Sequence, residues 1–97
     1  MDVEWDEEKS EANYRARGFD FSFGTLIFDG PTVEKEDRRK DYGEERVIAV
    51  GVADGIPLTL VYTDRKLPNG ETVRRIISAR KSNRRERKAY EKAFKGA

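Results

Sequence analysis

Two glycine-containing turn signals divide the middle of the chain into three β-rich segments. Asp54-Gly55 separates residues 46–53 (RVIAVGVA) from residues 57–63 (PLTLVYT), and Asn69-Gly70 precedes residues 73–81. Asp-Gly and Asn-Gly are strong signals for two-residue hairpin turns, because these residues tolerate the positive φ angles that such turns require. We therefore expect a three-stranded antiparallel meander at the centre of the fold.

The position of each turn also predicts the register of the strands. If the turns are centred on Asp54-Gly55 and Asn69-Gly70, three pairs of residues lie opposite each other on neighbouring strands. These pairs are Arg46 with Thr63, Arg65 with Arg74, and Arg80 with Thr59. Alternation then predicts one sheet face with Arg46, Val61, Thr63, Arg65, Arg74, Ile76, Ser78 and Arg80, and the other face with Tyr62, Arg75 and Ile77. A slip of one residue would exchange the two faces.

Capping residues predict two helices in the N-terminal part of the chain. After a short strand at residues 3–5, Asp6 is a good N-cap for a helix that runs through Arg17 and ends at Gly18. Asp20 caps a second, short helix that runs through Phe28. The helical period predicts one shared face with Trp5, Lys9, Ala12, Asn13 and Ala16, and an inward face on the second helix with Phe23, Leu26 and Ile27.

The remaining segments are a charged connection and a basic helix. Residues 32–45 are nearly all charged and predict a loop with a weak edge strand. Asn83 followed by Glu86 resembles a capping box and opens a last helix that runs to about Lys95. Its predicted buried stripe is Tyr90, Ala93 and Phe94, and its opposite row is Arg84, Lys88, Lys92 and Lys95.

These elements predict an α+β domain that spans residues 1–97. The expected sheet is small and antiparallel, with the meander and a short N-terminal or edge strand, packed with two N-terminal helices and the basic C-terminal helix. A chain of 97 residues has room for one such core. The acidic N-terminus and the lack of a long apolar run give no sign of a signal peptide or membrane segment, so we expect a cytoplasmic protein.

Positive charge is concentrated at the C-terminal end. The net charge is only +1, but the segment from Arg74 to Lys95 holds ten of the 20 Lys and Arg residues of the chain against two acids, Glu86 and Glu91. Such a segment attracts polyanions, because Lys and Arg displace the counterions of phosphates. The chain has no histidine and no cysteine, which excludes imidazole bases, Ser-His and Cys-His nucleophile pairs, and the usual zinc ligands. We expect no cofactor and no metal.

Five segments carry a resemblance to a known family over nearly the whole chain. They read EWDEEKSEAN, RGFDF, DYGEERVIAVG, VYTDR and RIISARKSNRRERKAYE, in that order. This pattern resembles the BrnT family of bacterial toxins, which are ribonucleases of type II toxin–antitoxin pairs. The resemblance implies a RelE-like fold, cleavage of mRNA, free or on the ribosome, that halts translation, and neutralisation by a ribbon-helix-helix-like antitoxin. Operator DNA would be bound only through the toxin–antitoxin complex.

The resemblance and the chemistry of RNA cleavage together suggest candidate residues. Without metal, the ribose 2′-OH commonly attacks the phosphate, so the protein must bind the phosphate and offset negative charge, for which arginine is well suited. The candidate catalytic residues are Arg80, Arg65, Arg75, Lys9 and Glu45; the candidate RNA-binding residues are Arg46, Arg74, Arg84, Arg85, Arg87 and Lys88. Glu45 is the best placed carboxylate for a base, but a tyrosine could act instead, or solvent could take the proton. Arg80 is the main candidate, since it lies just before a helix N-terminus.

Two alternatives to catalysis remain at this point, and one residue departs from the family. The basic helix could serve a non-catalytic RNA-binding or ribosome-binding module, or it could serve only as a surface for the antitoxin. Members of the family usually have Lys-His-Gly where this chain has Ala16-Arg17-Gly18. Any role of that histidine is therefore lost or passes to Arg17. Arg75 could also stack on Tyr62 as a structural cation–π pair.

Overall fold

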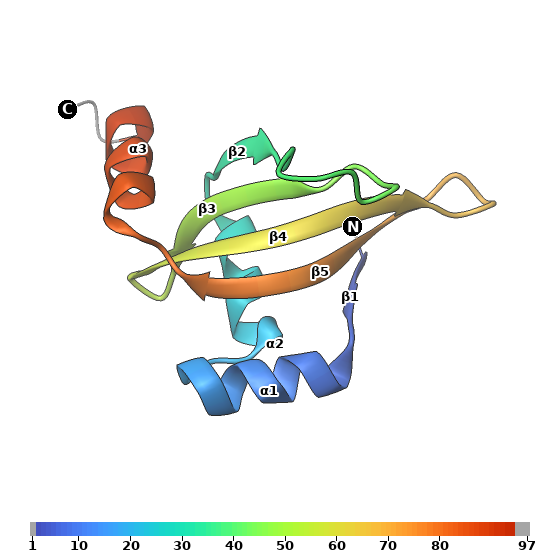
Figure 1. Ribbon diagram of the computed structural model, residues 1–97, viewed down its shortest axis with the longest axis horizontal. Helices are drawn as coiled ribbons and strands as arrows, with labels where there is room; N and C mark the ends of the chain where they lie inside the picture. The colour runs from blue at the N-terminus through green and yellow to red at the C-terminus, as the bar shows by residue number, and fades with distance from the viewer. Residues whose placement is uncertain (1, 95–97) are drawn as a thin grey trace.

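The computed structural model of the protein describes residues 2–94 and has an α+β architecture around one five-stranded sheet. The strands are β1 (Asp2–Trp5), β2 (Val33–Glu36), β3 (Val47–Ala53), β4 (Ile56–Lys66) and β5 (Thr72–Lys81), in the order β1-β5-β4-β3-β2 (Figure 1). The meander β3-β4-β5 and the weak edge strand β2 are confirmed. The expectation of a purely antiparallel sheet is wrong, because β1 pairs with β5 in parallel.

Helices α1 (Glu7–Arg17) and α2 (Phe21–Gly24) and the 3₁₀ helix η1 (Thr25–Asp29) cover one face of the sheet (Figure 1). Both predicted caps are confirmed, since the Asp6 carboxylate accepts from the Glu8 backbone N–H at 2.9 Å and that of Asp20 accepts from the Phe23 N–H at 2.8 Å. Gly18 ends α1 with a φ of 86°, a left-handed conformation that glycine adopts without strain.

The core lies between these helices and the sheet. Its buried apolar residues are Phe19, Phe21, Ile27, Ala49, Ala53, Leu58, Leu60, Tyr62, Ile76 and Ala79. The predicted helix faces are partly wrong. On α1 the buried residue is Ser10, whose hydroxyl accepts from the Phe21 N–H at 2.9 Å, and in η1 Leu26 is 40% exposed. The tight turn at Gly18 folds α2 back toward α1, so a polar contact replaces the expected apolar stripe.

The first hairpin forms as predicted, but the second does not. Ala53 pairs with Ile56 across a two-residue turn in which Asp54 and Gly55 have φ angles of 49° and 80°. In the second connection, the Gly70 N–H donates to the Leu67 carbonyl at 2.9 Å, so Pro68 and Asn69 are the central residues of the turn. Proline fixes its own φ near −65° and favours the first central position, which moves the turn away from Asn69-Gly70.

This displaced turn and a β-bulge determine the faces of the sheet. Near the turn, Arg65 pairs with Val73 and Arg74 with Asp64, so the predicted pairing of Arg65 with Arg74 is wrong. A bulge at Val61/Tyr62, where Ile77 is the extra residue, restores the predicted pairing of Thr59 with Arg80. Beyond the bulge, the register shift from the displaced turn and the shift from the bulge cancel, so the residues there have their predicted partners.

Because cross-strand partners share a face, the displaced turn moves three residues between the turn and the bulge to the face opposite the predicted one. Arg74 and Ile76 lie with Tyr62 on the face covered by α1 and α2, and Arg75 lies on the other face. We call this second face the open face, since α1 and α2 cover the other one, although its Thr59, Val61 and Thr63 are buried. It carries Thr59, Val61, Thr63, Arg65, Arg75, Ser78 and Arg80. The slip therefore places three of the candidate catalytic arginines on one face.

Helix α3 (Arg84–Phe94) begins as predicted but does not bury its apolar stripe. Asn83 and Glu86 form a reciprocal capping box, with distances of 2.8 and 2.9 Å. The predicted helix end at Lys95 lies outside the described residues. Tyr90 is half-buried, whereas Ala93 is exposed and Phe94 is 44% exposed. The expected stripe is wrong because α3 stands at one end of the sheet, so that the sheet covers only part of the helix (Figure 1).

Candidate functional site

The most organised charged site on the open face is the junction between β5 and α3. Arg80 near the end of β5 donates to Glu86 through both terminal nitrogens, with Nη1–Oε1 and Nη2–Oε2 distances of 2.7 and 2.8 Å. Planar bidentate pairs of this kind fix the orientation of the guanidinium as well as contributing energy. The Arg80 side chain is therefore held in one position although 40% of it is exposed.

Glu86 is itself fixed by several neighbours at the same junction. Its Oε1 accepts from the Asn83 backbone N–H at 2.8 Å and from the Thr59 hydroxyl at 3.1 Å. Thr59 and Ser82 share a hydrogen bond of 2.7 Å, and the Arg87 guanidinium donates to the Ser82 carbonyl at 2.8 Å. The carboxylate that caps α3 thus also positions Arg80, which couples the start of the helix to the candidate site.

These contacts shift the pKa values of Glu86 and Arg80. The hydrogen bonds from Arg80 hold the pKa of Glu86 at about 2, well below its usual 4.5, although burial acts in the opposite direction. The hydrogen bonds to Glu86 raise the pKa of Arg80, whereas burial and the positive charge of Arg39 act to lower it. At neutral pH the pair is ionised, and Glu86 is too weak a base to accept a proton from a sugar hydroxyl.

Arg80 still has donors for a second anion. A guanidinium has five N–H groups, and the pair with Glu86 uses one hydrogen on each terminal nitrogen. The edge formed by Nε and Nη2 can therefore grip a phosphate with two parallel hydrogen bonds while Glu86 remains in place. This geometry suits an arginine that binds an oxyanion and is held by a carboxylate behind it.

Arg39 is a cation near this site that the sequence reasoning missed. Its guanidinium donates to the buried Asp37 carboxylate at two distances of 2.8 Å, and its charge reaches Arg80. The hydrogen bonds from Arg39 lower the pKa of Asp37 to about 2. Residues 32–45 were predicted as a charged loop with a weak edge strand, and nothing in their spacing indicates that the loop folds toward Arg80. Two cations, each with its own carboxylate, therefore face the same region.

Arg65 and Arg75 form a second basic group on the open face, nearer the β4–β5 turn. Both form ion pairs with Glu4 of β1; the Arg75 Nη1 lies 3.8 Å from the Glu4 Oε2. Arg75 and Arg80 are five residues apart on β5, which corresponds to roughly 16 Å. One phosphate cannot contact both groups, so the open face suits an extended anion with several phosphates.

The side chains of Arg74 and Arg46 mainly contact carboxylates and aromatic rings of the protein itself. Arg74 forms a bidentate pair with Asp64 at 2.9 and 3.0 Å, lies 3.8 Å from the ring centre of Tyr62, and is 16% exposed. The expected stacking of Arg75 on Tyr62 is therefore wrong, because Arg74 occupies that place. Arg46 pairs with Glu44 at 3.0 Å and lies 3.9 Å from the ring centre of Tyr42. Both side chains are engaged within the fold.

The other predicted residues do not join the junction as a compact site. Lys9 is exposed on α1, on the covered side of the sheet. Glu45 lines a surface depression with Glu34, Glu36 and Val47, away from Arg80, so its surroundings do not support a role as base. Arg84, Arg85 and Lys88 are exposed on α3, whereas Arg87 is tied to the junction through Ser82.

Searches for two other kinds of site give a negative result for the part of the chain that is described. Within residues 2–94, no three His, Cys, Asp or Glu side chains are grouped so that they could hold a metal ion. Over the same range, none of the helices has the length and apolar character needed to cross a membrane.

Comparison with known proteins identifies the family. The family of the ribonuclease toxin BrnT of type II toxin–antitoxin systems matches residues 5–86 of the chain. This range includes the last residue of β1, the other four strands, Arg80 and the Glu86 that holds it. The search of curated proteins found no match. The match covers most of the chain and agrees with the segments noted in the sequence, so the protein belongs to the BrnT family of ribonuclease toxins, which act on RNA and have a cognate antitoxin.

Proposed function

We propose that the protein is a metal-independent endoribonuclease with a RelE-like fold, in which Arg80 is the main phosphate-binding residue. The observation that carries this proposal is the bidentate pair with Glu86, which holds a 40% exposed guanidinium at a fixed angle on the open face. Arg39 adds charge beside it, and Arg65 and Arg75 extend the positive track along the sheet.

The proposed reaction needs no protein group to act as nucleophile. The ribose 2′-oxygen forms a bond to the neighbouring phosphorus, and the bond from phosphorus to the 5′-oxygen of the next nucleotide breaks. The departing 5′-oxygen takes a proton from solvent, and the products are a 2′,3′-cyclic phosphate and a 5′-hydroxyl. The Arg80 guanidinium stabilises the charge that develops on the phosphoryl oxygens. Because the pKa of Glu86 is about 2, the proton of the 2′-hydroxyl passes to solvent and not to this carboxylate.

The cell biology that follows from this activity belongs to the same proposal. Cleavage of mRNA, free or on the ribosome, would stop translation in the cytoplasm. A ribbon-helix-helix-like antitoxin would neutralise the toxin, and only the complex would bind operator DNA.

Helix α3 has the features of a surface that the antitoxin covers. Tyr90 and Phe94 form an aromatic pair with ring centres 4.9 Å apart, and Phe94 is exposed. Arg84, Arg85 and Lys88 on the same helix favour an acidic partner segment. Exposed aromatic residues flanked by cations are typical of protein interfaces. Tyr90→Ala with Phe94→Ser should weaken antitoxin binding in a pull-down and leave RNA cleavage unchanged; unchanged antitoxin binding would place the interface elsewhere.

The central test compares wild type with Arg80→Ala on single-stranded RNA in the presence of EDTA. We expect wild type to cleave and Arg80→Ala to lose about 100-fold or more in rate, with RNA affinity within a few fold. Arg80→Ala leaves Glu86 without its partner, so Arg80→Ala/Glu86→Gln is the matched control, in which the glutamine retains the cap. Wild-type cleavage that EDTA abolishes, or full activity of the control, would contradict the proposal.

A further inference from the structure

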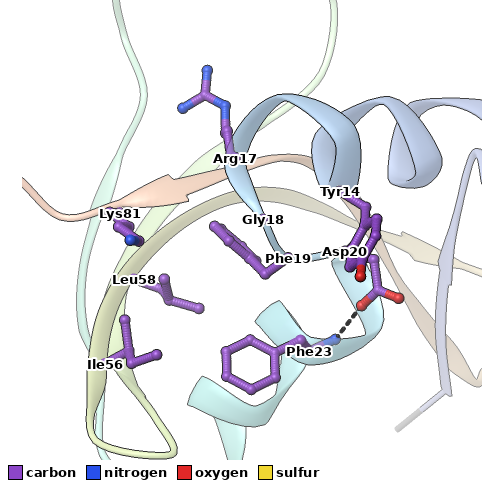
Figure 2. Close-up of a pocket in the computed structure, with 9 residues that line it drawn as sticks. All are labelled: Tyr14, Arg17, Gly18, Phe19, Asp20, Phe23, Ile56, Leu58 and Lys81. Atoms are coloured by element: carbon purple, nitrogen blue, oxygen red, sulfur yellow. Dashed lines mark hydrogen bonds between the residues drawn. The ribbon is translucent and has the colours of Figure 1, made fainter.

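A cavity of about 310 Å³ lies on the covered side of the sheet, beside the end of β5. It is bounded by the last turn of α1, the start of α2, and the adjacent ends of β4 and β5 (Figure 2). Sites for small molecules commonly have volumes of about 300 to 1,000 Å³. The cavity therefore has room for one flat ring system but not for a folded macromolecule.

The floor of the cavity is apolar and partly aromatic. Phe19 and Phe23 lie edge to face with ring centres 6.1 Å apart, and the aliphatic side chains of Leu58 and Ile56 complete the floor (Figure 2). The one acid at the cavity is Asp20, and its Oδ1 already accepts from the Phe23 N–H. Such a floor favours a planar, weakly polar group, because aromatic rings and methyl groups contact a π-face without polar partners.

The rim of the cavity is basic. Arg17 is in the last turn of α1, where Gly18 turns the chain away, and Lys81 is the last residue of β5. Both residues line the cavity and both are exposed. An apolar floor with cations at its rim is complementary to a ligand that has a flat apolar part and a phosphate.

The cavity is also next to the proposed phosphate site. Lys81 directly follows Arg80, and adjacent Cα atoms are about 3.8 Å apart, although the two side chains lie on opposite faces of the sheet. β1 pairs with β5 only from Val73 to Ile76, so this edge of β5 near Arg80 is not covered by β1. A single strand bound at Arg80 can pass over this edge and place the next nucleotide at the cavity.

We propose that the cavity binds one unstacked base of the RNA substrate, with the adjoining phosphate between Arg17 and Lys81. Stacking on aromatic side chains is sequence-tolerant and commonly accompanies a positively charged groove in proteins that bind single strands. The inference rests on the proposed path of RNA over the open face, and it adds a base-binding subsite on the other side of β5.

A titration of the wild-type protein tests the subsite directly. Adenosine 5′-monophosphate and ribose 5-phosphate, which lacks the base, are added separately while backbone amide signals are followed by NMR. We expect the nucleotide to shift the signals of Gly18, Phe19, Phe23 and Leu58, and ribose 5-phosphate to leave Phe23 and Leu58 unshifted. Shifts confined to the open face, equal shifts with both ligands, or no shifts would overturn the proposal.

Variants then test the subsite with an uncleavable 2′-O-methyl RNA and the same strand made abasic. Ile56→Ser should weaken binding of the normal strand at least threefold and leave the abasic strand unchanged, and Phe23→Leu should weaken the normal strand about tenfold. Leu26→Ser is the matched control, because Leu26 is 40% exposed and Ile56 39%, and Leu26 does not line the cavity. Equal effects of Ile56→Ser and Leu26→Ser would contradict the subsite.

Two charge-reversal variants on α1 distinguish a failure of the subsite from a failure of the proposed ribonuclease site. Arg17→Glu should weaken RNA binding at least tenfold, and Arg15→Glu, on the same helix but not at the cavity, should have less than a threefold effect. If Arg80→Ala abolishes cleavage but the two charge variants behave alike, the subsite is wrong and the ribonuclease site stands. If the signals of the cavity residues shift with the nucleotide but Arg80→Ala cleaves normally, the subsite stands and the proposed ribonuclease site is wrong.

Discussion

Arg74 and Arg80 lie on the same strand, and each forms a bidentate pair with one carboxylate, yet their surroundings differ. Arg74 lies on the covered face, 3.8 and 4.8 Å from the ring centres of Tyr62 and Phe28, and is 16% exposed. Arg80 lies on the open face beside the charge of Arg39 and is 40% exposed. An ion pair is therefore not enough to separate a structural arginine from one available to a ligand.

The role of each arginine depends on whether N–H donors of its guanidinium remain available after it pairs with its carboxylate. The Arg74 guanidinium contacts Asp64 and two rings, whereas Arg80 is held from one side by Glu86 and its side chain remains 40% exposed. The β-bulge at Ile77 separates the two, since without it alternation would place both on one face. Arg74 is therefore expected to stabilise the fold, and Arg80 to bind RNA.

The largest effect is expected for Arg74→Ala, on stability. The change removes a partly buried charge pair and two cation–π contacts, and we expect the free energy of unfolding to fall by about 3 kcal/mol. Cleavage per folded molecule should be unchanged. Urea denaturation gives the first value, and activity normalised to the folded fraction gives the second. Strong loss of specific activity with little change in stability would remove the distinction between the two arginines.

The second prediction concerns Glu86→Gln and acid stability. The pKa of Glu86 falls from 4.5 in the unfolded chain to about 2 in the fold, so the ionised carboxylate stabilises the fold above about pH 4.5. That contribution is lost as pH falls from 4.5 toward 2. Because Arg80 is half exposed, we expect the difference from wild type to be about 2 kcal/mol at pH 7.

The measurement is the midpoint of urea denaturation at pH 7 and pH 3 for both proteins. The gap between wild type and Glu86→Gln should shrink at pH 3. Asp37, whose pKa is also about 2, contributes to acid sensitivity in both proteins and cancels in the comparison. A gap that is the same at both pH values would show that Glu86 does not stabilise through its charge.

The third prediction uses Arg80→Lys, which keeps the positive charge but loses the planar guanidinium with its parallel N–H donors. A lysine cannot bind Glu86 and a phosphate at two fixed edges together, so we expect cleavage to fall about tenfold, or about 1.4 kcal/mol. Arg74→Lys should leave cleavage per folded molecule near the wild-type value. Single-turnover kinetics at saturating protein give both rates. Wild-type cleavage by Arg80→Lys would mean that only the charge at position 80 matters.

Local signals in the sequence predicted much of the fold. The caps at Asp6, Asp20 and Asn83 and the turn at Asp54-Gly55 depend on neighbouring residues, and the structure confirms them. The faces of β5 depend on where the second turn closes and on a bulge, neither of which a strand pattern reveals. One extra residue at Ile77 was enough to exchange Arg74 and Arg75.

The candidate site was less predictable, since its contacts join distant or irregular segments. Arg80 was recognised as a strand-end arginine and Glu86 as a cap, but their pairing requires the particular bend of the chain at Ser82. Arg39 approaches from a loop without a repeating pattern, and the stripe on α3 has the right period but is only partly covered by the sheet. Periodicity predicts which side chains share a face and not what covers that face.

The smallest effect is expected at the other end of the open face. Arg65 and Arg75 share Glu4 and are exposed, so Arg65→Gln/Arg75→Gln should lower RNA affinity only a few fold and leave the cleavage rate at saturation unchanged. Each lost phosphate contact should reduce the slope of log affinity against log salt by about 0.7. Arg38→Gln is the control, because Arg38 is 81% exposed and pairs with Glu36 outside the track. A salt dependence equal to that of the control would mean that RNA does not follow the open face beyond Arg80.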